Sequence, residues 1–210
     1  MQWSLITVVE FVDRIITAHT SSDCKSRYNF LSALLEATDD HATIRSELLN
    51  ILLAGRDTVA SLLSNILWEL PRHPDVLSTL RSEILSVSGD SPPSYDDLKN
   101  MKYLRAIVNE SQRLYPIVPM NSREALVDTV LPRGGGEDGL SPVMVPKGGV
   151  VGWNMYSMQR RKDVFGEDAE QFRPERWLEP GFRPGWAYVP FSGGPRVCIG
   201  QVSEHRILVG

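Results

Sequence analysis

Apolar residues recur at helical spacing over most of the first half of the chain. Residues 5–19 and 28–37 each place their apolar side chains on one face, which predicts two amphipathic helices. Residues 41–70 form the longest helical pattern and are apolar nearly all round through the middle, which is typical of a buried helix. We therefore expect this segment to be the central helix of the fold.

Three shorter helices are predicted after the central one. Pro71 and Pro74 are expected to end the central helix, because proline lacks a backbone N–H and clashes with the preceding turn. Helical patterns then cover residues 75–86, 94–101 and 103–115.

The pattern changes after Pro116. Residues 118–129 are strand-rich, and the glycine-rich residues 131–148 predict a hairpin. Residues 150–160 are expected to run from a strand into a helix, and residues 177–190 are irregular and rich in proline and tryptophan. The fold class is therefore predicted to be mainly α with a small β component.

Composition and charge narrow the class of protein. A chain of 210 residues with 42% hydrophobic and 23% charged residues can bury a sizeable core, which excludes disordered and fibrous proteins. The net charge of −4 gives no basic surface for nucleic acid, so we expect no nucleic-acid partner. The four histidines show no metal-ligand spacing.

The two cysteines, Cys24 and Cys198, are far apart and indicate a reducing compartment rather than a disulfide framework. Cys198 lies in the loop FSGGPRVCIG at residues 191–200. Its glycines let the backbone approach a large flat ligand and aim N–H groups at a thiolate. Arg196 suits a carboxylate at the edge of such a ligand, and Phe191 suits its apolar face. The loop predicts a haem cradle; the alternative is a buried, inert cysteine.

The pattern F-x-x-G-x-R-x-C-x-G resembles the haem-thiolate signature of the cytochrome P-450 monooxygenases. In this chain it is filled by Phe191, Gly194, Arg196, Cys198 and Gly200. The resemblance implies that Cys198 is the axial thiolate ligand of the iron of haem b and that the other four residues bind the cofactor.

The resemblance to this family covers about residues 5–201. It implies an incomplete cytochrome P-450 fold, with residues 1–210 forming only the C-terminal part of a single domain. Residues 202–210 look unlike the helix that follows the loop in the family, so we expect them to be an atypical tail.

The central helix contains AGRDT at residues 54–58, which resembles the oxygen-activation motif of the family at all five positions. Gly55 inside a helix costs about 1 kcal/mol relative to alanine, so we expect a bound dioxygen to need the space. A hydroxyl of Thr58 at a local widening of the helix, with Asp57 beside it, would deliver protons. The alternative is a small residue at a helix crossing next to a solvated acid.

Glu110 and Arg113 are three residues apart and share a helix face, so they can form an ion pair. FRPERW at residues 172–177 resembles the second arginine motif of the family, which implies that Arg176 completes a buried structural triad with them. Arg123 falls where some members place an arginine for a haem propionate; the alternative is a surface arginine on a strand.

The glycine-rich hairpin, with NSR before it and RRKDVFG after it, resembles the fungal branch that hydroxylates alkanes and fatty acids. At the position of Gln159, members of that branch often have histidine. The resemblance implies electrons from an NADPH-dependent cytochrome P-450 reductase and insertion of one oxygen atom from dioxygen into a small lipophilic substrate. Intact members lie at the cytosolic face of the endoplasmic reticulum membrane. Charged residues interrupt residues 2–18, so we expect no anchor here and a cytoplasmic location for the chain as written.

Two alternatives to a monooxygenase stay open. A member that rearranges peroxides would be expected to lack the acid–alcohol pair of Asp57 and Thr58. The other is an inactive truncated fragment or partial gene model that retains the haem-binding motifs.

Overall fold

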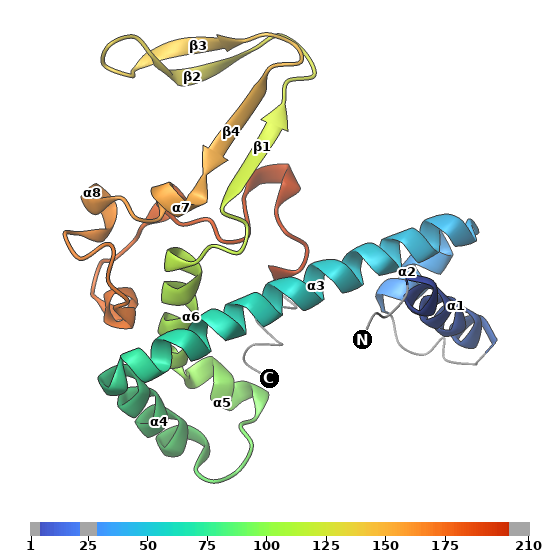
Figure 1. The fold of residues 1–210 in the computed structure, drawn as a ribbon, viewed down its shortest axis with the longest axis horizontal. Coiled ribbons are helices and arrows are strands. Elements are labelled where there is room, and N and C mark those ends of the chain that lie inside the picture. Colours follow the sequence, from blue (N-terminus) through green and yellow to red (C-terminus); the bar gives the residue numbers. More distant parts are fainter. Residues whose placement is uncertain (1–4, 22–28, 202–210) are drawn as a thin grey trace. The chain divides into compact units, whose positions relative to one another are not determined.

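The computed structural model describes residues 5–21 and 29–201. They fall into two compact units, Met1–Ala60 and Ser61–Gly210, each of which is described by itself (Figure 1). Cys24, His205 and the predicted tail at 202–210 lie outside the described residues. Among the described residues, no helix is both long enough and apolar enough to cross a membrane.

The first unit is helical and has its own small core. It contains α1 (Leu5–Ser21), α2 (Phe30–Ala37) and the beginning of α3 (His41–Glu69). Arg45 on α3 donates to Asp13 on α1 at 2.6 Å, which ties these two helices together. Apolar side chains from all three helices form the buried core, namely Val12, Ile16, Leu31 and Ile44.

The second unit is built around three more helices and the end of α3. These are α4 (Pro74–Ser88), α5 (Tyr95–Asn100) and α6 (Lys102–Leu114). The carboxylate of Glu83 on α4 accepts from the first N–H groups of α6, those of Tyr103 at 2.8 Å and Leu104 at 2.9 Å. The main core unites the three helices that pack here, through Leu62 and Ile66 of α3, Val76 and Leu80 of α4, and Tyr103, Ile107, Val108 and Leu114 of α6.

Two antiparallel ladders follow α6 and appear as successive ribbons in Figure 1. β1 (Met120–Glu124) pairs with β4 (Val150–Asn154), and β2 (Thr129–Gly135) pairs with β3 (Ser141–Val145). The hairpin predicted at 131–148 is therefore present, nested between the two outer strands.

Short helical turns carry the chain from β4 to the cysteine loop. They are α7 (Met155–Met158), α8 (Lys162–Phe165) and the 3₁₀ turns η3 (Pro174–Leu178), η4 (Gly185–Ala187) and η5 (Gly194–Arg196). This segment forms a second, smaller core of the unit, made of Phe165 in α8, Ala169 and Ala187 in η4.

The predicted fold class, mainly α with a small β component, is confirmed. Two details differ. Pro74 begins α4 at its first turn, where a missing N–H is harmless, and only Pro71 lies in the 3₁₀ turn η2 (Leu70–Arg72) that closes α3.

The expectation that the central helix is buried all round is wrong for α3. Large apolar side chains along it are exposed, with Leu53 at 54% and Leu67 at 68% of their surface accessible. An apolar pattern predicts which surface a helix would bury, but burial also needs a facing segment, and the described residues do not cover these positions.

Candidate functional site

The cysteine loop is shaped by its own backbone hydrogen bonds, and residues 194–199 are exposed. The N–H of Cys198 donates to the carbonyl of Phe191 at 2.9 Å, and the N–H of Val197 donates to the carbonyl of Gly194 at 3.1 Å. Phe191 is buried, whereas Arg196 and the free thiol of Cys198 are exposed. The alternative of a buried cysteine does not fit this exposure, and the thiol is open to a ligand.

Two glycines contribute to this loop in different ways. Gly194 has φ +72°, a left-handed conformation that side chains other than glycine rarely adopt. A Cβ added to Gly200 would make an ordinary van der Waals contact of 3.5 Å with the sulfur of Cys198, so glycine leaves more room beside the thiol without being required there. The small residues thus shape the backbone and keep the surroundings of the sulfur clear.

The structure brings Glu110, Arg113 and Arg176 together in the interior of the second unit. Arg113 binds Glu110 through two parallel bonds, Nε to Oε2 and Nη2 to Oε1, both of 2.8 Å. Arg176 donates from Nε to Oε1 of Glu110 at 3.0 Å. The side chains of Glu110 and Arg113 are 0% exposed and that of Arg176 is 1% exposed. This is a buried charge cluster, in which each charge depends on the others.

The two guanidinium groups also bind backbone carbonyls of the segment between α7 and η3. Arg113 donates to the carbonyl of Gln159 at 2.9 Å and to that of Ala169 at 2.6 Å. Arg176 donates to the carbonyl of Phe165 at 2.8 Å. The cluster therefore fixes the path of the chain around α8 as well as its own geometry.

Asp168 extends the cluster toward the surface. Its carboxylate accepts from Arg173 at 2.5 Å and from Arg176 at 3.3 Å. Burial alone would raise the pKa of Asp168, but the charges and hydrogen bonds of these two arginines outweigh burial and lower its pKa. The carboxylate therefore remains ionised at neutral pH and balances one of the two buried guanidinium groups.

Two partners of Glu110 were missed by the sequence interpretation. The indole N–H of Trp177 donates to Glu110 at 2.9 Å, and the backbone N–H of Arg173 donates to it at 2.9 Å. Both belong to FRPERW, so the signal was the tryptophan that directly follows the expected arginine. The motif binds the glutamate through three of its six residues rather than one.

Arg123 lies on β1 and is exposed. Its guanidinium donates to Asn121 Oδ1 at 3.0 Å and to the carbonyl of Ser122 at 2.7 Å, and it lies 5.2 Å from the centre of the Trp153 ring. No salt bridge to Arg123 occurs among the residues that the structure describes, so its charge is not neutralised by a carboxylate there.

Asp57 and Thr58 lie on the part of α3 that belongs to the first unit, so their geometry is described apart from the cysteine loop. The hydroxyl of Thr58 donates to the carbonyl of Ala54 at 2.6 Å, one turn earlier. Asp57 accepts from Arg56 at 2.7 Å, and this hydrogen bond lowers the pKa of Asp57. The helix is α-helical throughout, so the predicted local widening is absent from α3. Apart from the neighbouring backbone of α3 itself, a Cβ on Gly55 would meet no atom of the described residues within 4 Å.

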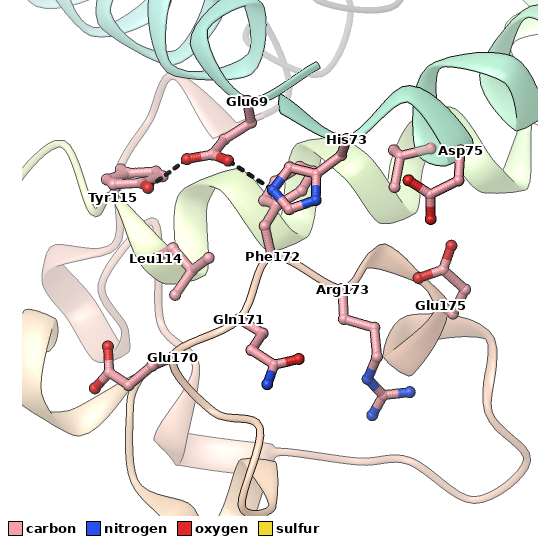
Figure 2. Close-up of a pocket in the computed structure, with 11 residues that line it drawn as sticks. Glu69, His73, Asp75, Leu114, Tyr115, Glu170, Gln171, Phe172, Arg173 and Glu175 are labelled. Atoms are coloured by element: carbon pink, nitrogen blue, oxygen red, sulfur yellow. Dashed lines mark hydrogen bonds and ion pairs between the residues drawn. The ribbon is translucent and has the colours of Figure 1, made fainter. Parts of the chain in front are cut away.

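A pocket of about 520 Å³ opens between the end of α3, the start of α4 and the segment before η3 (Figure 2). Glu69 bridges two of its walls, because it accepts from the hydroxyl of Tyr115 and lies 3.1 Å from Nε2 of His73. Burial and this carboxylate together raise the pKa of Tyr115 to about 12. In Figure 2 the carboxylates of Asp75 and Glu175 point toward each other across the pocket. None of the residues predicted for haem or oxygen lines it.

Comparison with known proteins now assigns the family. The family model for cytochrome P-450 matches residues 5–202. The chain belongs to the cytochrome P-450 family. The match includes α3, the buried charge cluster and the cysteine loop, so these features are parts of one family pattern.

Relatives among fungal cytochromes P-450 are about half identical to this chain. A cytochrome P-450 monooxygenase, himC, of Aspergillus japonicus is 53% identical over 83% of the chain and 31% of its own length. Cytochrome P-450 52A6 of Candida tropicalis is 50% identical over 84% of the chain and 35% of its own length. A cytochrome P-450 monooxygenase, fsdH, of Fusarium heterosporum is 49% identical over 84% and 31%. The chain thus spans about a third of the length of the curated relatives that it matches.

The family implies a haem cofactor, and the residues of the cysteine loop fit one. A thiol that is exposed and flanked by glycines can approach a large planar ligand, and the exposed guanidinium of Arg196 two residues earlier is free to meet an anionic edge. The buried ring of Phe191 gives the loop an apolar base.

Proposed function

We propose that this chain is the C-terminal, haem-binding part of a single cytochrome P-450 domain that acts as a haem-thiolate monooxygenase. The observation that carries the proposal is the exposed thiol of Cys198 in a glycine-shaped loop, within a chain of this family. Haem b supplies oxygen activation when it is bound through a cysteine thiolate.

The residues proposed to hold haem b divide by their chemistry. Cys198 would provide the thiolate to the iron, Gly194 and Gly200 would let the backbone approach the ring, and buried Phe191 would support the loop from its apolar base. Arg196 and Arg123 each present an exposed guanidinium suited to a propionate. The triad of Glu110, Arg113 and Arg176 is proposed to act structurally, since its members are buried and face other protein groups.

Asp57 and Thr58 are proposed to move protons on the oxygen side of the cofactor. The bond from Arg56 lowers the pKa of Asp57, so this carboxylate is ionised at neutral pH and is proposed to hold, through hydrogen bonds, the water from which protons are delivered. Thr58 Oγ1 donates to Ala54, and it must leave this carbonyl in order to donate to an oxygen ligand. The acid–alcohol pair also argues against a peroxide-rearranging member.

The proposed substrates are alkanes or fatty acids, with electrons from an NADPH-dependent cytochrome P-450 reductase. Support comes from the resemblance of the hairpin region to the fungal branch that hydroxylates such compounds, and from the similarity to cytochrome P-450 52A6. Turnover of a long-chain fatty acid by the chain supplied with reductase and NADPH would test the substrate class. Thr58→Val is then expected to raise the share of NADPH oxidised without product, whereas unchanged coupling would remove the proposed role of Thr58.

The haem-thiolate assignment has a direct spectroscopic test. The purified chain is loaded with haem, reduced and exposed to carbon monoxide, and the position of the Soret band is recorded. A strongly red-shifted band is expected for the wild type and its loss for Cys198→Ala. A folded wild-type chain without this band, or a Cys198→Ala variant that retains it, would contradict the assignment.

A further inference from the structure

Gln159 is a fully buried amide whose groups all face backbone partners. Its side chain is among the largest that are completely enclosed, with 0% of the residue exposed. The amide nitrogen donates to the carbonyls of Gln112 at 3.1 Å and Arg113 at 3.2 Å. The amide oxygen accepts from the backbone N–H of Val189 at 3.3 Å. The reversed orientation would set an oxygen against two carbonyls, so these partners define which way the amide points.

The two carbonyls belong to the last turn of α6, where a helix leaves its acceptors without partners. The carbonyl of Ser111 in that turn accepts from Tyr115 N–H at 2.8 Å, and the next two are those that Gln159 binds. A buried carbonyl without a donor costs about 1–3 kcal/mol, which is why a side chain from elsewhere in the sequence is placed here. Gln159 therefore caps α6 from a distant segment.

The same amide reaches the segment that leads into the cysteine loop. Val189 donates its N–H to Gln159 and accepts at its carbonyl from Ser192 N–H at 3.0 Å. Phe191, two residues after Val189, accepts from the N–H of Cys198 at 2.9 Å. Hydrogen bonds joined by the backbone of residues 189–192 thus link the end of α6, through one amide, to the backbone of the cysteine.

We propose that Gln159 is a positioning residue that sets the location of the Cys198 loop relative to α6. Only the expected effect of Gln159 on iron ligation rests on the proposed haem-thiolate function. The structural part concerns the chain itself: without the amide, Val189 loses its N–H partner and the base of the loop loses a fixed point on α6.

A second contact near Val189 limits the size of the effect. The hydroxyl of Tyr188 lies 3.1 Å from Oε1 of Gln112 and 3.3 Å from Oδ1 of Asn109, both on α6. This contact places the preceding side chain but leaves the N–H of Val189 to Gln159. Loss of the amide should therefore loosen the loop locally and leave the unit folded.

The test uses substitutions that separate polarity from volume. Gln159→Met fills the same space without donor or acceptor. Gln159→His is the conservative variant, because a neutral imidazole donates from one nitrogen and accepts at the other. Gln159→Asn keeps the amide but is too short to reach both partners, and it serves if Gln159→Met does not fold. Gln171→Met is the matched control, since its side chain is exposed.

The first measurement is amide hydrogen exchange of the haem-free chain by NMR. We expect the N–H of Val189 to exchange about fivefold faster in Gln159→Met than in the wild type, which corresponds to one net hydrogen bond of about 1 kcal/mol. Exchange within α4, on the far side of the core, should be unchanged, as should Val189 in Gln171→Met. Equal exchange of Val189 in wild type and Gln159→Met, or uniform acceleration throughout the unit, would overturn the proposal.

The second measurement is the carbon monoxide spectrum of the reduced, haem-loaded variants. Gln159→Met should convert part of the red-shifted thiolate band into an unshifted one, and Gln159→His should restore it. Identical spectra of wild type and Gln159→Met would overturn the positioning role at the iron. A wild-type chain without the thiolate band would instead contradict the proposed function, while the exchange data would still decide the role of Gln159 in the loop.

Discussion

Replacing Glu110 by glutamine should remove a large part of the stability of the second unit. The carboxylate accepts five hydrogen bonds, from Arg113 twice, from Arg176, from Trp177 and from the backbone of Arg173. Glu110→Gln keeps the shape of the side chain and creates no cavity. It removes the one negative charge between two guanidinium groups and turns an N–H₂ toward donors.

The magnitude follows from the burial of the charges. With Arg113 at 0% and Arg176 at 1% exposure, neither guanidinium can recover water when Glu110 is lost. Arg176 keeps its longer contact of 3.3 Å with Asp168, so Arg113 bears the larger part of the loss. Breaking a buried pair in this way costs about 3–5 kcal/mol, whereas a domain is typically stable by about 5–15 kcal/mol in total. An exposed pair contributes about 0–1 kcal/mol. The ion pair of Asp163 with Arg161, whose side chains are 64% and 53% exposed, is the matched control.

The assay is urea unfolding followed by tryptophan emission. Four of the five tryptophans lie in the second unit, so the signal reports mainly on it. We expect Glu110→Gln to lower the free energy of unfolding by about 3–5 kcal/mol and Asp163→Asn by less than about 1 kcal/mol. Equal losses, or a loss below about 1 kcal/mol for Glu110→Gln, would refute the argument that burial makes this cluster interdependent.

Three further predictions concern other parts of the second unit. The buried hydroxyl of Ser111 has no hydrogen-bond partner among the described residues, so Ser111→Ala should raise the free energy of unfolding by about 1 kcal/mol; a loss in urea unfolding would mean that the hydroxyl is bonded. The pKa of Tyr115 is raised to about 12 by burial and Glu69, so the folded state retains a proton that the unfolded state releases near pH 10, and stability should fall as the pH rises from about 10 to about 12. Tyr115→Phe should weaken this fall, and an unchanged slope of unfolding free energy against pH would exclude Tyr115 as a source. A Cβ on Gly193 would lie 2.5 Å from the ring of Trp186, so Gly193→Ala should move this exposed indole and shift its emission while changing stability by no more than about 0.5 kcal/mol; unchanged emission would contradict the contact.

The sequence was sufficient for elements that depend on local spacing. The helical pattern at 103–115 corresponds to α6 (Lys102–Leu114), and the spacing of Glu110 and Arg113 puts them in contact on it. The hairpin signals between 118 and 160 likewise correspond to four strands in two ladders. These features follow from helix and strand periodicity, which the order of residues records directly.

Contacts across long sequence distances were not predictable in the same way. Gln159 binds carbonyls 46 and 47 residues earlier and an N–H 30 residues later, and no local pattern marks a glutamine for such a role. The exposure of α3 was mispredicted for a related reason. The hydrophobicity of Leu53 and Leu67 indicates that they suit a buried face of the helix. It does not indicate whether the described residues include a segment that covers this face.

The polar face of α6 explains how a loop with few contacts of its own can have a defined position. Residues 194–199 are exposed, and local backbone bonds fix only the internal shape of the loop. Its placement must come from the preceding segment, which three side chains connect to α6. Trp177 binds Glu110 and Tyr188 binds Gln112, both on α6. Gln159 binds two carbonyls at the end of α6 and the N–H of Val189. Because a buried polar partner is costly to leave unpaired, these contacts have few alternative arrangements. Substitutions on α6 that touch no ligand should therefore act on the thiol of Cys198 through the chain that leads to it.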